Sequence, residues 1–213
     1  MSITRILGDT VYYKEKRMKR LITYVLLIVV AISFSGCIIN NVPTYDEEVK
    51  AAWAQVNNQY KRRADLIPNL IATVKGYAKH ERDVLKEVTE ARSRATSMVL
   101  PKDLLTNPEA FKKFQAAQGE LSSALSRLLA VSERYPDLKA DKNFLALQSQ
   151  LEGTENRIAV ARRDYIAAVK KYNLELRTIP NKWIASFLYP DAKPKQVFTV
   201  TKEEAKVPKV EFN

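Results

Sequence analysis

Residues 49–77 read VKAAWAQVNNQYKRRADLIPNLIATVKGY, and this stretch decides the fold class of the chain. Apolar side chains recur in it at alternating spacings near three and four residues, which is the heptad-like period of one helix face. They are Val49, Trp53, Val56, Tyr60, Ile67, Leu70, Val74 and Tyr77. Arg63 fills the one expected apolar position that carries a charge. The stretch therefore predicts a long amphipathic helix that packs against other helices.

Pro68 lies inside this stripe without shifting its phase. A proline removes the backbone hydrogen bond to the carbonyl four residues earlier, here that of Ala64, so we expect a kink. The alternative is a new helix capped by Asp65, with Pro68 tolerated in its first turn.

A second question is whether residues 45–99 form one helix or two. Gly76 and the charged run 79–83 indicate a break, although the apolar stripe stays in phase beyond them. A single helix would be about 80 Å long, at 1.5 Å per residue, and would outrun its partners. We therefore expect two helices.

Further amphipathic segments complete the predicted fold. Thr106 and Glu109 have the spacing of a capping box, Pro136 ends the helix that follows, and Asp141 can cap the last long helix. The expected helices span 45–78, 82–99, 107–135 and 141–178. Short loops between such helices favour antiparallel neighbours. The predicted fold is all-α: an antiparallel up-and-down four-helix bundle over 45–179.

The C-terminal tail, 180–213, has a different character. It begins with one or two amphipathic turns and continues with prolines and a β-like stretch at 196–200. The apolar residues of the turns are Trp183, Ile184, Phe187 and Leu188. We expect this irregular tail either to pack back on the bundle or to project from it.

The N-terminal segment, 1–37, has the layout of an export signal or membrane anchor. A basic cluster at 16–20 precedes the apolar run 21–34, and small residues lead to Cys37. Basic, apolar and small residues follow one another in this order in secretory signals. Met18 has the form of a conventional signal start, so we expect the natural chain to begin there; if it begins at Met1 instead, residues 1–17 form a cytoplasmic extension.

Cys37, the only cysteine, excludes a disulfide within the chain. The segment before it is similar to a bacterial lipobox, in which the cysteine carries the lipid, although Phe34 stands where an aliphatic residue is usual. The apolar run extends to Ile39 and reaches about nineteen residues, so an uncleaved transmembrane helix is the alternative to lipidation. The sequence favours a lipid on Cys37.

Both anchors give the same orientation. The cations lie before the apolar run, and after the linker 38–44 come Asp46, Glu47 and Glu48. The positive-inside rule then places the body outside the cytoplasm, in the periplasm or at the cell surface. If Cys37 is lipidated, Ile38 after it permits sorting to an outer membrane.

The net charge of +11 does not by itself indicate a nucleic-acid partner. The cations are interleaved with carboxylates along the predicted helices, as expected for solvated helix faces. For an exported chain, anionic lipid or cell-wall polymer is a better candidate than nucleic acid. Such binding would use basic faces such as 61–63 and the pair Lys112 and Lys113.

The sequence offers no set of catalytic residues. His80 is the only histidine, and Glu81 and Asp83 are too close to it in sequence to share a helix face. Metalloprotease, nucleophile-elbow and phosphate-loop motifs are absent from the sequence. We expect a solvated turn around His80, and neither a metal, a cofactor nor an enzymatic activity.

Several segments resemble the LemA family closely. They are AWAQV at 52–56, RRADLIPNL at 62–70, VKGYAKHE at 74–81, VTEARS at 88–93 and AKVPKVEF at 205–212. The resemblance extends over 18–213 and implies a bacterial, membrane-anchored, extracytoplasmic bundle of four helices without an agreed biochemical activity. Cys37 departs from many members, in which a plain hydrophobic anchor is usual.

The segment around Pro68 is the best candidate for a partner surface. Its residues are Arg62, Arg63, Asp65, Pro68 and Asn69. In the structural interpretation, the carbonyl freed by the proline and the nearby charges are satisfied within the chain. In the functional interpretation, the segment docks a partner. We expect a non-enzymatic scaffold or adaptor that binds a membrane protein or envelope protease, with lipid or polymer binding as the alternative and self-association also possible.

Overall fold

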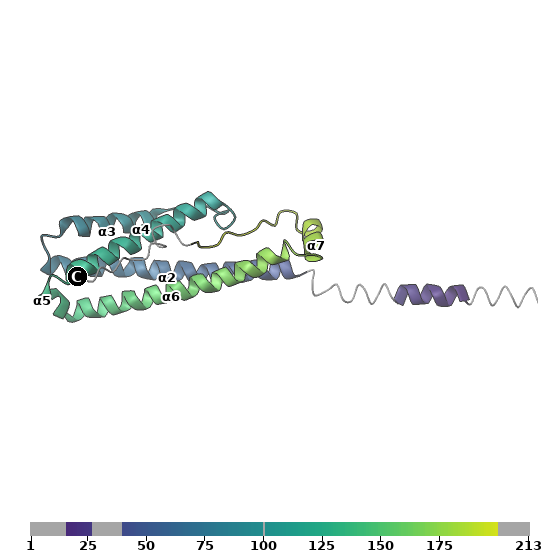
Figure 1. Cartoon of the computed structure of the whole chain (residues 1–213), viewed down its shortest axis with the longest axis horizontal. Coiled ribbons are helices and arrows are strands. Elements are labelled where there is room, and N and C mark those ends of the chain that lie inside the picture. Colours follow the sequence, from purple (N-terminus) through teal and green to yellow (C-terminus); the bar gives the residue numbers. More distant parts are fainter. Residues whose placement is uncertain (1–15, 27–39, 100, 200–213) are drawn as a thin grey trace, which may run out of the picture.

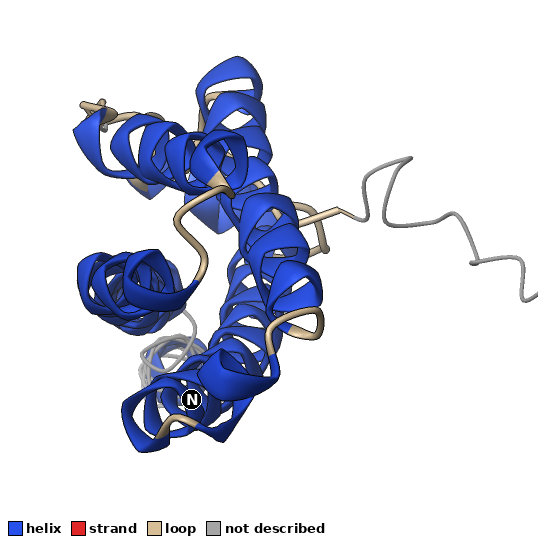
Figure 2. Ribbon diagram, turned by 90° about the vertical axis from the view of Figure 1, so that its left-hand side faces the viewer, coloured by secondary structure: helices blue, strands red, loops and turns tan. Residues whose placement is uncertain are grey.

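The computed structural model describes residues 16–26, 40–99 and 101–199, and in these ranges it contains helices and loops but no strand (Figures 1 and 2). The predicted all-α class is therefore confirmed for the described part of the chain. One helix covers residues 16–26. The helices after residue 40 are α2 (Asn41–Tyr77), α3 (Arg82–Ser97), α4 (Pro108–Ser132), α5 (Pro136–Ala140), α6 (Lys142–Glu175) and α7 (Asn181–Leu188).

The long helices pack in antiparallel pairs, α2 along α6 and α3 along α4 (Figure 1). In the first pair, Asn41 at the start of α2 contacts Glu175 at the end of α6, while Tyr77 at the far end of α2 donates to Asp141 over 2.9 Å. The 37 residues of α2 make it about 55 Å long, at 1.5 Å per residue. The body is accordingly an elongated rod.

The core consists of two clusters along this rod. Near the start of α2 the cluster is rich in aromatic rings, which include Trp53, Phe111, Phe114, Tyr165 and Phe198. Towards the end of α2 the cluster is mainly aliphatic, and it includes Ile67, Leu70, Val88, Leu128 and Leu151. Full burial of each such side chain stabilises the fold by about 1.5–3 kcal/mol.

The apolar stripe of α2 mostly faces this core, as its spacing predicts. Six of its members are buried: Val49, Val56, Tyr60, Ile67, Leu70 and Val74. Tyr77 is an exception, because the residue is 44% exposed while its hydroxyl donates a hydrogen bond to Asp141. The stripe identified the buried face but extends one turn too far.

Helix α2 ends at Tyr77 and α3 begins at Arg82. The segment 45–99 therefore contains two helices, as predicted, and not one. Helix α2 also continues through Pro68 without a new start at Asp65. It begins at Asn41, inside the segment 38–44 that was expected to be a linker. Proline is compatible with the first turn of a helix, where its missing N–H is not needed, so Pro43 does not prevent this start.

The N-cap of α4 differs from the predicted capping box. Asn107 is the cap, and its Oδ1 accepts from the N–H groups of Glu109 and Ala110, both at 3.1 Å. The Thr106 hydroxyl donates instead to the Asp103 carbonyl. A residue before proline is restricted to extended backbone, which is the conformation of an N-cap. Pro108 therefore favours Asn107 as the N-cap residue.

Helix α4 ends at Ser132, three residues before the predicted end at residue 135. Pro136 then begins the short helix α5. Asp141 caps α6 as predicted, and its Oδ1 accepts from the Phe144 N–H at 2.9 Å. That bond, together with the Tyr77 hydroxyl, holds the pKa of Asp141 below its usual value.

The tail packs back on the body as far as the structure describes it. Phe198 is buried in the aromatic cluster, and the Tyr165 hydroxyl donates to the Gln196 carbonyl at 2.8 Å. The Gln196 N–H donates to the Leu105 carbonyl at 2.7 Å. The expected β-like stretch is not a strand over 196–199, because its backbone bonds a loop and side chains instead of another strand. Residue 200 and those after it lie outside the described residues.

Candidate functional site

The candidate partner surface around Pro68 lies in the middle of α2. Arg62, Asp65, Pro68 and Asn69 are exposed there, as a surface requires. Arg63 is only 1% exposed. Its inclusion in the surface is therefore wrong: it occupies a position in the apolar stripe, and the stripe faces the interior.

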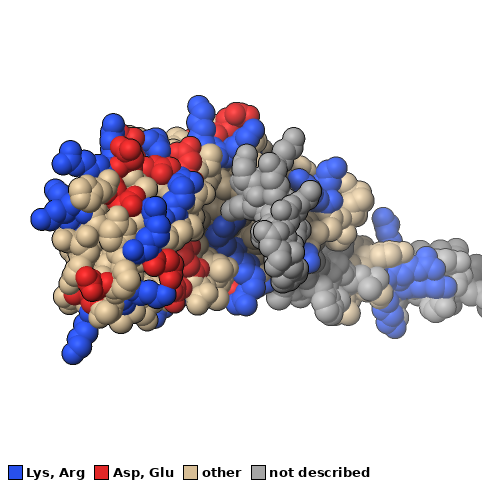
Figure 3. All heavy atoms as spheres, turned by 60° about the vertical axis from the view of Figure 1, so that its left-hand side comes forward, with Lys and Arg blue, Asp and Glu red and all other residues tan. Residues whose placement is uncertain are grey.

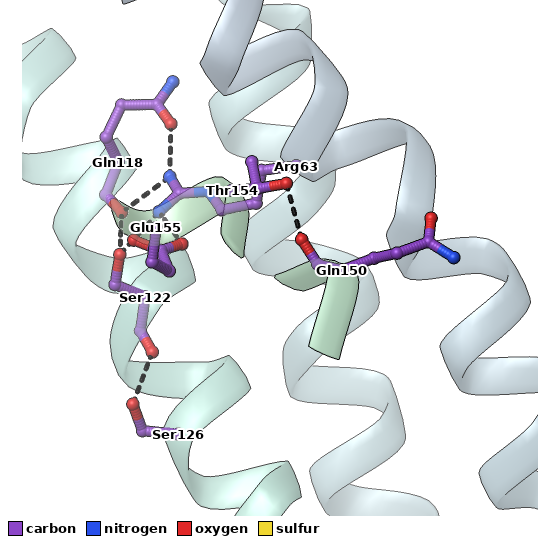
Figure 4. A network of polar contacts seen from close by, with 7 residues as sticks. All are labelled: Arg63, Gln118, Ser122, Ser126, Gln150, Thr154 and Glu155. Carbon is purple, nitrogen blue, oxygen red and sulfur yellow. Dashed lines mark hydrogen bonds and ion pairs between the residues drawn. The ribbon is translucent and has the colours of Figure 1, made fainter. Parts of the chain in front are cut away.

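The buried guanidinium of Arg63 joins three helices (Figure 4). Its Nη1 donates to Ser122 Oγ of α4 at 2.7 Å and to Glu155 Oε1 of α6 at 2.9 Å. Its Nη2 donates to the Gln118 side-chain oxygen at 2.7 Å and to the Gln118 carbonyl at 3.3 Å. The guanidinium also lies 5.1 Å from the centre of the Tyr60 ring. A single side chain thus fixes α2 against both α4 and α6.

The charge of Arg63 would be costly to bury alone, by several kcal/mol. Glu155 supplies the opposite charge, and its own side chain remains 44% exposed. The ion pair therefore lies at the edge of the core, with the cation inside and the anion partly in water. This arrangement neutralises the guanidinium while the carboxylate keeps much of its hydration.

The carbonyl freed by Pro68 is bonded from another helix. Arg92 of α3 donates its Nε–H to the Ala64 carbonyl at 2.8 Å. A partly buried carbonyl left without a partner would cost about 1–3 kcal/mol, so this bond compensates for the one that proline removes. Pro68 and Arg92 act as a pair that connects α2 to α3, which favours the structural interpretation of this segment.

The sequence did not identify the partners in these two links. Arg63 was conspicuous as a charge in an apolar stripe, and Ala64 as the carbonyl that a proline frees. Arg92, Gln118 and Glu155, however, are polar residues among many on their helices. Only the rotational register of α3, α4 and α6 against α2 brings them to these positions.

His80 lies in the exposed turn between α2 and α3. In the described ranges, no three or more His, Cys, Asp or Glu side chains are grouped so that they could hold a metal. The neighbouring Glu81 instead links α3 to the end of α4, because it accepts from Arg134 and from the Tyr135 hydroxyl, both at 3.0 Å. The bond to Glu81 raises the pKa of Tyr135.

A cleft of about 760 Å³ lies at the end of the rod where α2 begins. Asp46, on its wall, pairs with Lys195 and with Lys50, each at 2.8 Å. Burial raises the pKa of Asp46, but the two ammonium groups outweigh this effect and hold the pKa below its usual value. Lys102 and Lys193 also line the cleft, as do Asp103 and Asp191, so its lining has four lysines against three carboxylates.

Elsewhere the surface charges are mixed. Figure 3 shows Lys and Arg side chains interspersed with Asp and Glu on the face that it presents. Of the basic faces considered for lipid or polymer, Lys112 and Lys113 are exposed on α4, whereas Lys61 pairs with Asp65 at 3.1 Å and Arg63 is buried. The 61–63 face therefore presents less free positive charge than its sequence suggests.

The proposed lipid site, Cys37, and most of the apolar run before it lie outside the described residues. Of the helices that the structure describes, none has both the length and the apolarity needed to cross a bilayer.

Comparison with known proteins shows which proteins the chain resembles. The model of the LemA family matches residues 52–212, which confirms the resemblance seen in the sequence. The chain is 26% identical over 162 residues to the magnetosome proteins MamQ 1 and MamQ 2 of Paramagnetospirillum magneticum. It is 25% identical over 141 residues to protein LemA of Metamycoplasma hominis. These matches cover 66–68% of the chain but only 60% of each relative, so the chain spans about three fifths of the length of these curated relatives.

Proposed function

Because this chain belongs to the LemA family, we propose that it is a membrane-tethered, extracytoplasmic scaffold of the bacterial cell envelope that binds another protein and catalyses no reaction. The observation that carries the proposal is the use of its conspicuous polar groups. Arg63, Arg92 and Glu81 each tie one helix to another. A chain whose buried and partly buried charged groups connect its helices is suited to present a fixed surface.

The tether is proposed from the sequence. The basic cluster at 16–20, the apolar run 21–34 and Cys37 support an exported chain held by a lipid, or by a spanning helix if the segment is not cleaved. Helix α2 begins four residues after Cys37. Four extended residues reach at most about 14 Å, so the start of α2 would lie close to the membrane surface.

We take α2, α3, α4 and α6 as the four helices of an up-and-down bundle. On its surface, Arg62, Asp65 and Asn69 follow one another at spacings of three and four residues, so they share one face of α2. All three are exposed. This face, without Arg63, is the proposed contact for an envelope protein.

Site-specific photocrosslinking in cells tests the proposal. A photoreactive residue at Asn69 should give one discrete crosslinked product with an envelope protein. The same residue at Ser149, which is exposed on α6, is the matched control and should not give that product. Equal crosslinking from both positions, or none from Asn69, would refute a specific contact at this face.

The tether has its own test. Radiolabelled palmitate should enter the native chain and not the Cys37→Ala variant. Equal labelling of both would exclude a lipid on Cys37, and membrane fractionation of the variant would then show whether a spanning helix holds the chain.

A second candidate function is binding of anionic lipid or cell-wall polymer, favoured by the exposed pair Lys112 and Lys113. Such binding should weaken steeply with ionic strength, because the Debye length falls from about 10 Å at 0.1 M salt to 3 Å at 1 M. A packed protein interface should weaken little. Vesicle or polymer binding that is unchanged in the Lys112→Glu, Lys113→Glu variant would remove this candidate.

A further inference from the structure

An ordinary surface helix turns its large apolar side chains towards the body, whereas α7 turns them towards solvent. Its small residue, Ala185, is 3% exposed and faces the body. Trp183 and Phe187 are 63% and 84% exposed. Each is two residues from Ala185, and at 3.6 residues per turn two residues rotate about 200°, so both rings point away from the body. The helix thus directs its aromatic side chains outward.

Other exposed apolar side chains lie close to these rings in the chain. Between residues 174 and 188, Leu174, Ile179 and Leu188 are also at least 43% exposed. Other exposed large apolar side chains of the body, such as Val99, Leu145 and Val160, are separated along the rod. Exposed large apolar side chains that cluster in one segment of a folded chain indicate an interaction site, whereas isolated residues need no explanation.

The position of α7 is fixed by a buried carboxylate. Glu175, 7% exposed, accepts from Asn41 Nδ2 at 2.5 Å with one oxygen and from Asn181 Nδ2 at 2.8 Å with the other. The first residue of α7 is thereby held beside the first residue of α2. Figure 1 shows α7 at this end of the rod, opposite α5.

This is the end at which the chain leads back to the proposed anchor. Cys37 precedes α2 by four residues, so the proposed tether would hold α7 near the membrane surface through the same short connection. Tryptophan and other amphipathic aromatic side chains concentrate at the membrane–water interface. Exposed basic residues, Arg177, Lys182 and Lys193, lie next to the apolar residues and suit anionic headgroups.

We propose that α7 is a second membrane contact, with Trp183 and Phe187 inserted into the interface of an anionic phospholipid bilayer. The proposal rests on the tether of the proposed function and extends it. A single attachment point leaves a rod free to tilt, and a contact through α7 restricts that tilt and sets which side of the rod faces outward.

Fluorescence of the full chain in vesicles of phosphatidylethanolamine and phosphatidylglycerol tests this contact. The chain has two tryptophans, and Trp53 lies in the aromatic cluster of the core. The difference between the native chain and Trp183→Phe therefore isolates the emission of Trp183 without altering the core. We expect that emission to shift to shorter wavelength on vesicles and to lose intensity when the acyl chains carry bromine.

A matched control places a tryptophan at the opposite end of the rod. Leu145, near the start of α6, is 48% exposed and lies 30 residues from Glu175. That separation is about 45 Å along the helix. In the double variant Trp183→Phe, Leu145→Trp, the new tryptophan should not be quenched by brominated lipid.

The outcomes separate the contact from the tether. A chain that floats with the vesicles while Trp183 keeps its water-exposed, unquenched emission would overturn the α7 contact and leave the tether intact. A blue-shifted emission that bromine does not quench would mean that protein, such as a second copy, covers α7, and would also overturn the proposal. A native chain that does not float with vesicles would refute the tether and the α7 contact together.

Discussion

The link made by Arg63 predicts an unequal response to the loss of its two charges. Glu155→Ala leaves the guanidinium, which is 1% exposed, without its anion. Breaking a buried pair in this way costs about 3–5 kcal/mol, and we expect the lower end, about 3 kcal/mol, since Arg63 keeps its bonds to Ser122 and Gln118.

Removing the cation instead should cost less. In Arg63→Met the remaining carboxylate of Glu155 is 44% exposed and can be hydrated. The loss is then the unpaired oxygen of buried Gln118, about 1–3 kcal/mol, and apolar burial of the methionine side chain, about 1.5–3 kcal/mol, offsets most or all of it. We expect a net change of about 1 kcal/mol or less, and a double variant close to Arg63→Met alone.

Unfolding of the detergent-solubilised chain by guanidinium chloride, followed by circular dichroism, measures these differences in the free energy of unfolding. The comparison requires that the dependence of that free energy on denaturant concentration be the same for all variants. Against a total stability of about 5–15 kcal/mol, a loss of about 3 kcal/mol is readily detected. Glu152→Ala is the control, because within the described part of the chain this exposed residue of α6 accepts a hydrogen bond only from Gln148, and its loss should change stability by no more than about 0.5 kcal/mol. If Glu155→Ala proved as mild as the control, or milder than Arg63→Met, the guanidinium would not depend on this pair.

Three further predictions concern other links. Arg92→Leu should destabilise the chain by about 1–3 kcal/mol in unfolding experiments, because the Ala64 carbonyl loses its donor. This cost should shrink in a Pro68→Ala background, where the backbone N–H of residue 68 can donate to that carbonyl, and equal costs in both backgrounds would contradict the link. The lowered pKa of Asp46 stabilises the fold at pH values above its unfolded pKa of about 3.9, and this stability is lost as the pH falls through the folded pKa. The Asp46→Asn variant should therefore lose less stability than the native chain below about pH 4, and parallel plots of stability against pH would disprove this role. Phe198→Ala should lower the free energy of unfolding by about 3–5 kcal/mol and make the tail accessible to limited trypsin digestion. A tail that stays protected would show that its backbone hydrogen bonds hold it on the body without the ring.

The sequence predicts the buried face of α2 well, because helical periodicity is a local property. It also marks Arg63 as an anomaly and Ala64 as a carbonyl in need of a donor. It does not indicate whether Arg63 turns inward or outward, since that depends on Gln118, Ser122 and Glu155 on two other helices. Assigning Arg63 to a partner surface was therefore an error about tertiary contacts.

The same limit applies to α7. Its amphipathic character is visible in the sequence, and the usual expectation is that Trp183 and Phe187 pack on the body. The structure turns the helix the other way because Asn181 is fixed to Glu175 and Phe198 from the tail already occupies the aromatic cluster. Which apolar residues fill a core is decided by competition between segments, and periodicity does not reveal the outcome.

The two proposed contacts together set the height at which a partner can bind. Asn69 lies 28 residues beyond Asn41 along α2, which is about 42 Å at 1.5 Å per residue, and Arg62 lies about 32 Å along. If the start of α2 and α7 both lie at the membrane and the rod stands upright on it, this face lies about 30–40 Å from the bilayer, and a partner that contacts the face must project that far. Envelope proteins with only short extracytoplasmic loops do not meet this requirement, whereas those with folded extracytoplasmic domains do.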